Sequence, residues 1–221
     1  MRNLRFGPFL MATFIALAAA LTADRLQAAP LSRAQALKAL VQEDATVRQA
    51  GIERLAEVGS MADAPQLVAN LRDDEPTLRE EAASALWQIW SRSGDPAIDK
   101  LLIRGVLQMQ SSSLEEARST FDEIVRRRPS FAEAWNKRAT VHYLMGNLQA
   151  SLKDVTEVLR RNPYHFGALS GAGRIHFQLG NDKAALAFLQ RALAVNPNLE
   201  GIDEMIETIQ ERLEEKTRNS T

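Results

Sequence analysis

The stretch HFGALSGAGRIHF at 165–177 combines residues that could do chemistry: glycines, a serine and two histidines. A serine nucleophile on a strained turn needs glycines two residues before and after it, following a strand. Here Gly167 and Gly171 lie three residues before and one residue after Ser170, and no strand pattern precedes them. A phosphate-binding loop needs its own glycine spacing and a strand–turn–helix context, which this stretch also lacks. The pattern favours neither site.

The composition sets further limits on function. The chain has 221 residues, a net charge of −1, 45% hydrophobic and 25% charged residues, which is typical of a folded globular protein. The near-neutral charge gives no reason to expect a nucleic-acid partner, since such partners need a basic face. The absence of cysteine excludes disulfides, thiolate metal ligands and a cysteine nucleophile.

Residues 1–28 have the layout of a secretory signal peptide. Arg2 and Arg5 precede an apolar run from Phe9 to Leu21, and small residues follow. The run is shorter than the roughly 20 residues that span a bilayer. We therefore expect cleavage after Ala28 or Ala29, export to the periplasm of a Gram-negative-type cell, and no membrane span in the mature chain. An uncleaved anchor is the alternative.

The elements around 165–177 repeat with a fixed period. Pro129, Pro163 and Pro197 are each 34 residues apart, and each follows an amphipathic run. Because proline cannot continue a helix, it marks a helix end and a turn. Gly146 and Gly180, also one period apart, lie where a helix C-terminus favours a positive φ. The pattern predicts a unit of two helices and two turns.

These units resemble tetratricopeptide repeats, and three units are predicted, over 98–131, 132–165 and 166–199. Each unit is numbered so that its proline is position 32. Position 4 is then a large residue, namely Leu101, Trp135 and Leu169. Position 8 is a small residue, namely Gly105, Ala139 and Gly173. Arg104 and Arg138 depart from the pattern at position 7, where the family has leucine. Gly171 is a helix-interior glycine that its position does not demand.

An amphipathic segment over 200–217 follows the third unit, with apolar residues at helical spacing and an acidic opposite face. Repeat arrays need a terminal cap with a polar outer face. We expect this segment to be a capping helix.

The first half repeats with a different period. The segments starting at Glu43 and Asp74 superimpose at an offset of 31 residues, with Arg48 on Arg79. This pattern resembles short HEAT-type repeats, which we place at 31–97, with Asp44 and Asp74 as expected N-caps. The helix at about 95–109 fits both registers. The fold expected is therefore all-α: a right-handed α-solenoid of antiparallel helix pairs, running from HEAT-like hairpins into the three tetratricopeptide units.

Two residue clusters have two readings each. Trp87 and Trp90 share one helix face, which is either core or an exposed anchor for a partner. The arginines at 126–128 and 160–161 precede the repeat prolines. They either stabilise helix C-termini, where cations are favoured, or form a basic edge that attracts an acidic partner.

The resemblance implies a concave groove lined by the first helix of each unit, suited to an extended peptide or a partner helix. Glu133 and Gly167 are also among the positions that the resemblance places in this groove. The candidate partner-binding residues are Asn136, Thr140, Tyr143, Ser170, Arg174 and Phe177. Some family members grip a C-terminal carboxylate with lysines and asparagines, but the lysines are missing here, so chaperone-tail binding is not predicted.

His142 and His176 lie one period apart, at a position where the family has a packing tyrosine. A zinc site needs further ligands with suitable spacing, and none is visible. We therefore expect no metal, no cofactor and no catalytic residue. The function expected is a non-enzymatic protein–protein interaction scaffold in the periplasm. The alternative is an exported enzyme or small-ligand-binding protein that uses this histidine pair.

Overall fold

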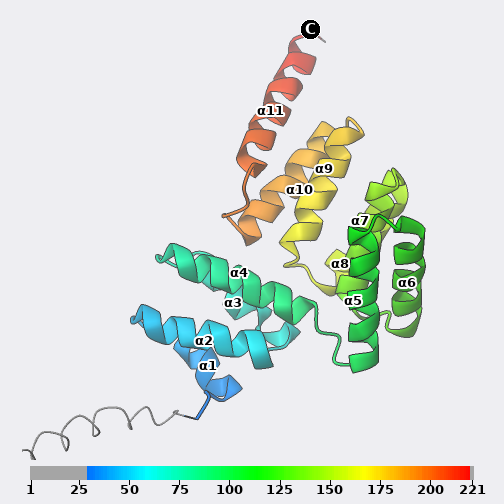
Figure 1. The fold of residues 1–221 in the computed structure, drawn as a ribbon. Coiled ribbons are helices and arrows are strands. Elements are labelled where there is room, and N and C mark those ends of the chain that lie inside the picture. The colour runs from blue at the N-terminus through cyan, green and yellow to red at the C-terminus, as the bar shows by residue number, and fades with distance from the viewer. Residues whose placement is uncertain (1–28, 220–221) are drawn as a thin grey trace, which may run out of the picture. The chain divides into compact units, whose positions relative to one another are not determined.

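The computed structural model describes residues 29–219, and all regular structure in that range is helical, as predicted (Figure 1). The expected signal peptide at 1–28 lies outside the described residues. None of the described helices is both long and apolar enough to cross a membrane. The helices are α1 (Arg33–Ala39), α2 (Ala45–Val58), a 3-10 turn η1 (Met61–Asp63), α3 (Ala64–Asn70), α4 (Pro76–Trp90), α5 (Pro96–Gln110), α6 (Leu114–Arg127), α7 (Ala132–Leu144), α8 (Leu148–Arg161), α9 (Phe166–Gln178), α10 (Asp182–Val195) and α11 (Ile202–Arg218).

The six helices from α5 to α10 form three consecutive hairpins. α5 packs on α6, α7 on α8 and α9 on α10. Neighbouring hairpins meet where α6 packs on α7 and where α8 packs on α9. Gly146 and Gly180 follow α7 and α9 with φ values of +77° and +74°, as the sequence predicts for helix ends.

The N-terminal helices form a second set of hairpins, in which α2 packs on α1 and α4, and α3 packs on α4. Asp44 caps α2 by accepting from Thr46 N at 2.8 Å. The expected cap at Asp74 is wrong, because α4 begins at Pro76 and its N-cap is Glu75. Arg48 and Arg79 have equivalent roles, since each donates to backbone carbonyls of the turn before its own helix.

The N-terminal helices also contact the third repeat. Asn198 Nδ2 donates to Leu71 O at 2.7 Å, and the Arg72 guanidinium donates to Ala194 O at 2.5 Å. A linear solenoid in which each repeat contacts only its neighbours does not predict these contacts.

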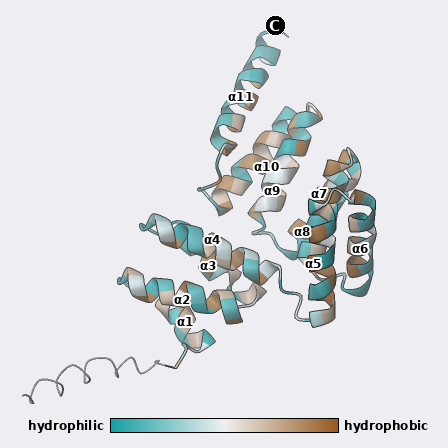
Figure 2. Cartoon of the chain, viewed as in Figure 1, coloured by the Kyte–Doolittle hydropathy of each residue, from teal (hydrophilic) through white to brown (hydrophobic). Residues whose placement is uncertain are grey.

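Helix α11 covers the end of the array. Its buried Ile202 and Ile209 join Leu189 of α10 in one apolar cluster. The Asp182 carboxylate, whose side chain is 1% exposed, pairs with Arg212 at 3.2 Å and Lys216 at 2.6 Å. Most of the remaining surface of α11 is hydrophilic (Figure 2), as a cap requires.

Candidate partner-binding groove

Four of the six predicted groove residues lie around one cavity of about 150 Å³ between α7 and α9. Asn136, Thr140 and Tyr143 come from successive turns of α7, and Arg174 comes from α9. Side chains three or four residues apart share one face of a helix, which is why the repeat positions converge here. The rest of the lining is mostly apolar: Ala139, Ser151, Val155, Gly167, Ala168, Gly171 and Ile175.

Gly171 lines this cavity and faces open space. A Cβ built on this residue has no heavy atom within 4 Å, outside its own helix backbone and chain neighbours. A glycine inside a helix costs about 0.5–1 kcal/mol relative to alanine, and packing does not require it here. The sequence left this glycine unexplained, and the structure places it in the lining of the cavity.

Ser170 and Phe177 do not line the cavity. The Ser170 hydroxyl donates to Gly167 O at 3.1 Å, within its own helix. Phe177 is partly buried in the C-terminal apolar cluster, with the Arg212 guanidinium 4.6 Å from its ring centroid. Phe177 therefore packs against α11 and not on the predicted groove face. The repeat pattern does not define the position of α11.

The rim of the cavity is polar and includes the Arg174 guanidinium. Thr140 Oγ1 donates to Asn136 O at 3.0 Å, and Tyr143 is 41% exposed. Arg174 is exposed and takes part in none of the ion pairs found between residues 29 and 219. The site therefore combines a small apolar recess with a hydroxyl-lined rim and an exposed guanidinium.

Glu133, implied as a groove residue, is instead fully buried beside His165. His165 Nδ1 accepts from Ala168 N at 3.1 Å, so the geometry places the ring proton on Nε2, which lies 3.0 Å from Glu133 Oε2. Burial raises the pKa of Glu133. The hydrogen bond and charge of His165 together with the charge of Lys137 lower it by more, so the net pKa is below its ordinary value. This pair is structural and does not face the groove.

The two tryptophans of α4 cover this buried pair. The Trp90 ring stacks on His165 at 4.7 Å between centroids, and Trp87 meets His165 edge-on at 5.2 Å. Both tryptophans also contact Phe166. Their shared face is therefore packing surface between the N-terminal helices and the third repeat, the first of the two readings from the sequence.

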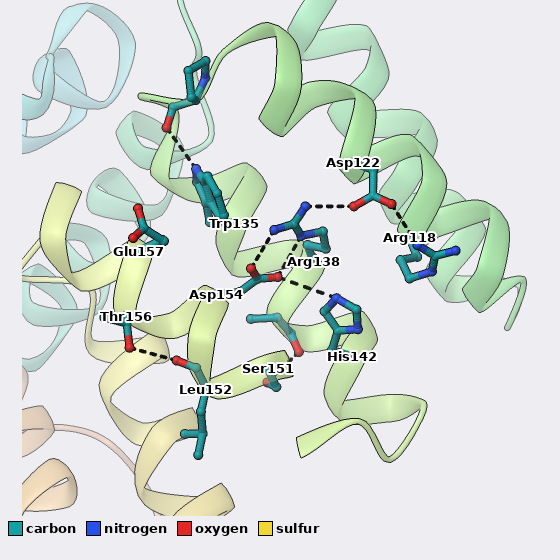
Figure 3. A network of polar contacts seen from close by, with 12 residues as sticks. Arg118, Asp122, Trp135, Arg138, His142, Ser151, Leu152, Asp154, Thr156 and Glu157 are labelled. Atoms are coloured by element: carbon teal, nitrogen blue, oxygen red, sulfur yellow. Dashed lines mark hydrogen bonds and ion pairs between the residues drawn. The ribbon is translucent and has the colours of Figure 1, made fainter. Parts of the chain in front are cut away.

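Arg138, which departs from the repeat pattern, joins three helices. Its guanidinium binds Asp154 of α8 at 2.8 and 2.7 Å and Asp122 of α6 at 2.8 Å (Figure 3). The hydrogen bonds to Asp154 and then Asp122 raise the pKa of Arg138. The guanidinium groups of Arg138 and Arg161 lie 4.8 and 4.6 Å from the ring centroid of Trp135. Sequence reasoning missed this network, although the aspartates sixteen residues before and after Arg138 were a usable signal.

The two histidines of the alternative hypothesis have separate surroundings. His142 Nε2 lies 3.8 Å from Asp154 Oδ2, while the His176 ring stacks on Phe188 at 5.3 Å. Within the described part of the chain, no three histidine, aspartate or glutamate side chains are grouped closely enough to hold a metal ion.

Comparison with known proteins agrees with the hairpin geometry. Residues 104–155 and 138–199 match the profile of the family described as tetratricopeptide repeat. A TPR repeat-containing protein of Rhizobium etli is 31% identical over 96 residues, which cover 41% of this chain and 45% of that relative. The chain therefore matches less than half the length of this relative.

Solved structures share the fold at low sequence identity. The Sgt2 TPR domain from Aspergillus fumigatus is 19% identical with a TM-score of 0.53, covering 57% of this chain and 85% of that one. The first TPR of Spaghetti (RPAP3), bound to the HSP90 peptide SRMEEVD, is 18% identical with a TM-score of 0.51, covering 52% and 92%. MamA is 15% identical with a TM-score of 0.50, covering 68% and 82%. Together with the three hairpins, these matches support the assignment of residues 104–199 as tetratricopeptide repeats.

Proposed function

We propose that this protein is an exported, periplasmic interaction scaffold, and not an enzyme, that holds a peptide or a segment of a partner protein in the groove between α7 and α9. The observation that carries the proposal is the convergence of Asn136, Thr140, Tyr143 and Arg174 on one apolar recess. Apolar recesses with a few placed polar groups are typical of binding sites.

The dimensions of the recess suit one side chain of an extended partner. A volume of about 150 Å³ accommodates an aliphatic side chain but no folded element. The exposed rim groups can hydrogen bond to the partner's main chain, and Arg174 can bind a neighbouring carboxylate. The peptide held by the first TPR of Spaghetti is consistent with this mode, since that domain has the same fold.

A pair of leucine substitutions tests the proposal. Gly171→Leu fills the recess, whereas Thr156→Leu adds the same side chain on an exposed position of α8. Tagged wild type and both variants are purified from the native envelope fraction, and the co-purified proteins are quantified by mass spectrometry. We expect a discrete partner with wild type and Thr156→Leu and a loss of at least tenfold with Gly171→Leu. Equal recovery with Gly171→Leu contradicts the groove.

Export has its own test. The tagged full chain is followed by osmotic-shock fractionation of a Gram-negative host. We expect the mature chain, shortened by 28 or 29 residues, in the periplasmic fraction, because of the layout of residues 1–28. An unprocessed chain in the membrane fraction would instead support the anchor alternative.

A further inference from the structure

A second cavity, of about 140 Å³, lies where the end of α4 meets the turns that follow α6 and α8. It is separate from the groove and shares no residue with it. Its lining includes Trp90, Arg92, Arg128, Phe131, Arg161 and Asn162. Three of its lining residues are arginines and none is acidic, so the lining has three guanidinium groups and no carboxylate.

The three arginines differ in how far their charge is neutralised. Arg161 forms an ion pair with Glu157. Among the described residues, Arg92 donates to two neutral carbonyls, those of Gly59 at 2.9 Å and Ala56 at 2.5 Å. Arg128 forms no ion pair with any residue between 29 and 219. Arg92 and Arg128 therefore form no ion pair with any described residue.

Two buried N–H groups of the lining also lack acceptors. The side chains of Trp90 and Asn162 are 2% and 0% exposed, and neither Trp90 Nε1 nor Asn162 Nδ2 has a hydrogen-bond partner among the described residues. A buried donor without an acceptor destabilises the folded chain. Both unpaired groups are donors, so a ligand that relieves them supplies acceptor atoms.

The start of α7 opens on the same cavity. Its N-cap is Phe131, which offers no side-chain acceptor, whereas the equivalent His165 of the next repeat caps α9. No described side chain caps the first N–H groups of α7, and the acidic residue in its first turn is Glu133. Helix N-termini favour anions because their free N–H groups and dipole point outward.

We propose that this cavity binds a small oxyanion of the phosphate class, either free phosphate or the phosphoryl group of a small metabolite. Arg128 is the principal ligand, Arg92 contributes charge, and the start of α7 contributes N–H donors. Guanidinium groups suit this anion because their donors match its oxygens in pairs. Only part of the arginine cluster at 126–128 belongs to the site. Arg128 lines the cavity, whereas Arg127 pairs with Glu123 one turn earlier in α6.

Neighbouring arginines provide a matched test. Arg128→Gln removes the charge at the cavity. Arg126→Gln removes an equal charge from an exposed position in the last turn of α6, which does not line the cavity. The mature chain is titrated with inorganic phosphate against chloride at equal ionic strength. Binding is measured by equilibrium dialysis with radiolabelled phosphate and by the shift in Tm. A parallel arm uses glycerol phosphate to separate free phosphate from an ester.

We expect one phosphate per chain for wild type and Arg126→Gln, with Tm raised by about 3–5 °C at ten times the Kd. Arg128→Gln should weaken binding at least tenfold. Ser130→Asp, which places a carboxylate in the exposed turn at the cavity, should have the same effect and serves if Arg128→Gln fails to fold. Undetectable binding of both anions to wild type, or equal loss in Arg126→Gln and Arg128→Gln, overturns the proposal.

Discussion

Two glycines of α9, two residues apart, should respond in opposite ways to alanine. The Cβ of Gly171→Ala has no heavy atom within 4 Å, outside its own helix backbone and chain neighbours, so the change mainly removes the conformational cost of glycine. We expect stabilisation by about 0.5–1 kcal/mol, or a rise in Tm of about 1–4 °C for a chain of this size.

Gly173→Ala meets a different environment. Its Cβ would lie 2.5 Å from Cδ2 and 2.6 Å from Cγ of Leu189, a side chain that is fully buried. Overpacking of a core typically costs about 1–3 kcal/mol, and the helix-propensity gain offsets less than about 1 kcal/mol of it. We expect a net loss of about 1–2 kcal/mol.

Urea unfolding followed by far-UV circular dichroism measures both variants, with the slope m checked to be unchanged. Destabilisation by Gly171→Ala, or stabilisation by Gly173→Ala, would refute the assignment of one glycine to an open recess and the other to close helix packing. The comparison also separates stability from binding. If Gly171 keeps the recess open for a partner, larger residues there should weaken capture while leaving the fold intact.

Three further variants test the contacts between elements. Arg138→Leu, which restores the usual family residue, leaves the nearly buried carboxylate of Asp154 without its cation, so we expect a loss of about 2–3 kcal/mol in urea unfolding; an unchanged midpoint would show that the network contributes nothing. Trp87→Ala removes a half-buried ring from the contact with α9, and we expect a loss of about 2–3 kcal/mol, measured in the same way and contradicted by wild-type stability. Because the pKa of Glu133 is lowered in the folded state, its charge stabilises the fold above the ordinary pKa of 4.5, and that contribution is lost as the pH falls below this value. The urea midpoint of wild type should therefore fall more steeply between pH 5 and 3 than that of Glu133→Gln, and parallel profiles would exclude this role.

The resemblance to tetratricopeptide repeats explains why much of the groove could be predicted. It implies which positions of each first helix face the groove, so Asn136, Thr140, Tyr143 and Arg174 could be assigned to one surface from the sequence. The same rule failed for Phe177, because α11 lies outside the periodic pattern and packs on this ring. It also failed for Glu133, whose carboxylate pairs with His165, because Trp90, which stacks on His165, belongs to a helix with a different period.

Contacts between distant segments left no periodic trace in the sequence. The hydrogen bonds from Asn198 to Leu71 O and from Arg72 to Ala194 O join residues more than 120 positions apart. Nothing in either local pattern specifies that pairing. The basic cavity is missed for the same reason, since Arg92, Arg128 and Arg161 come from three separate helix ends.

Site-specific photocrosslinking tests the central claim most directly, because it reports which surface touches a partner in the cell. Benzoylphenylalanine replaces Tyr143 at the rim of the recess or, as a matched control, Tyr164, the other tyrosine of the chain, which does not line it. We predict a discrete crosslinked partner from position 143 that is lost when Gly171→Leu is added, and none from position 164. No adduct at 143, or the same adduct from both positions, would contradict a partner-binding groove between α7 and α9.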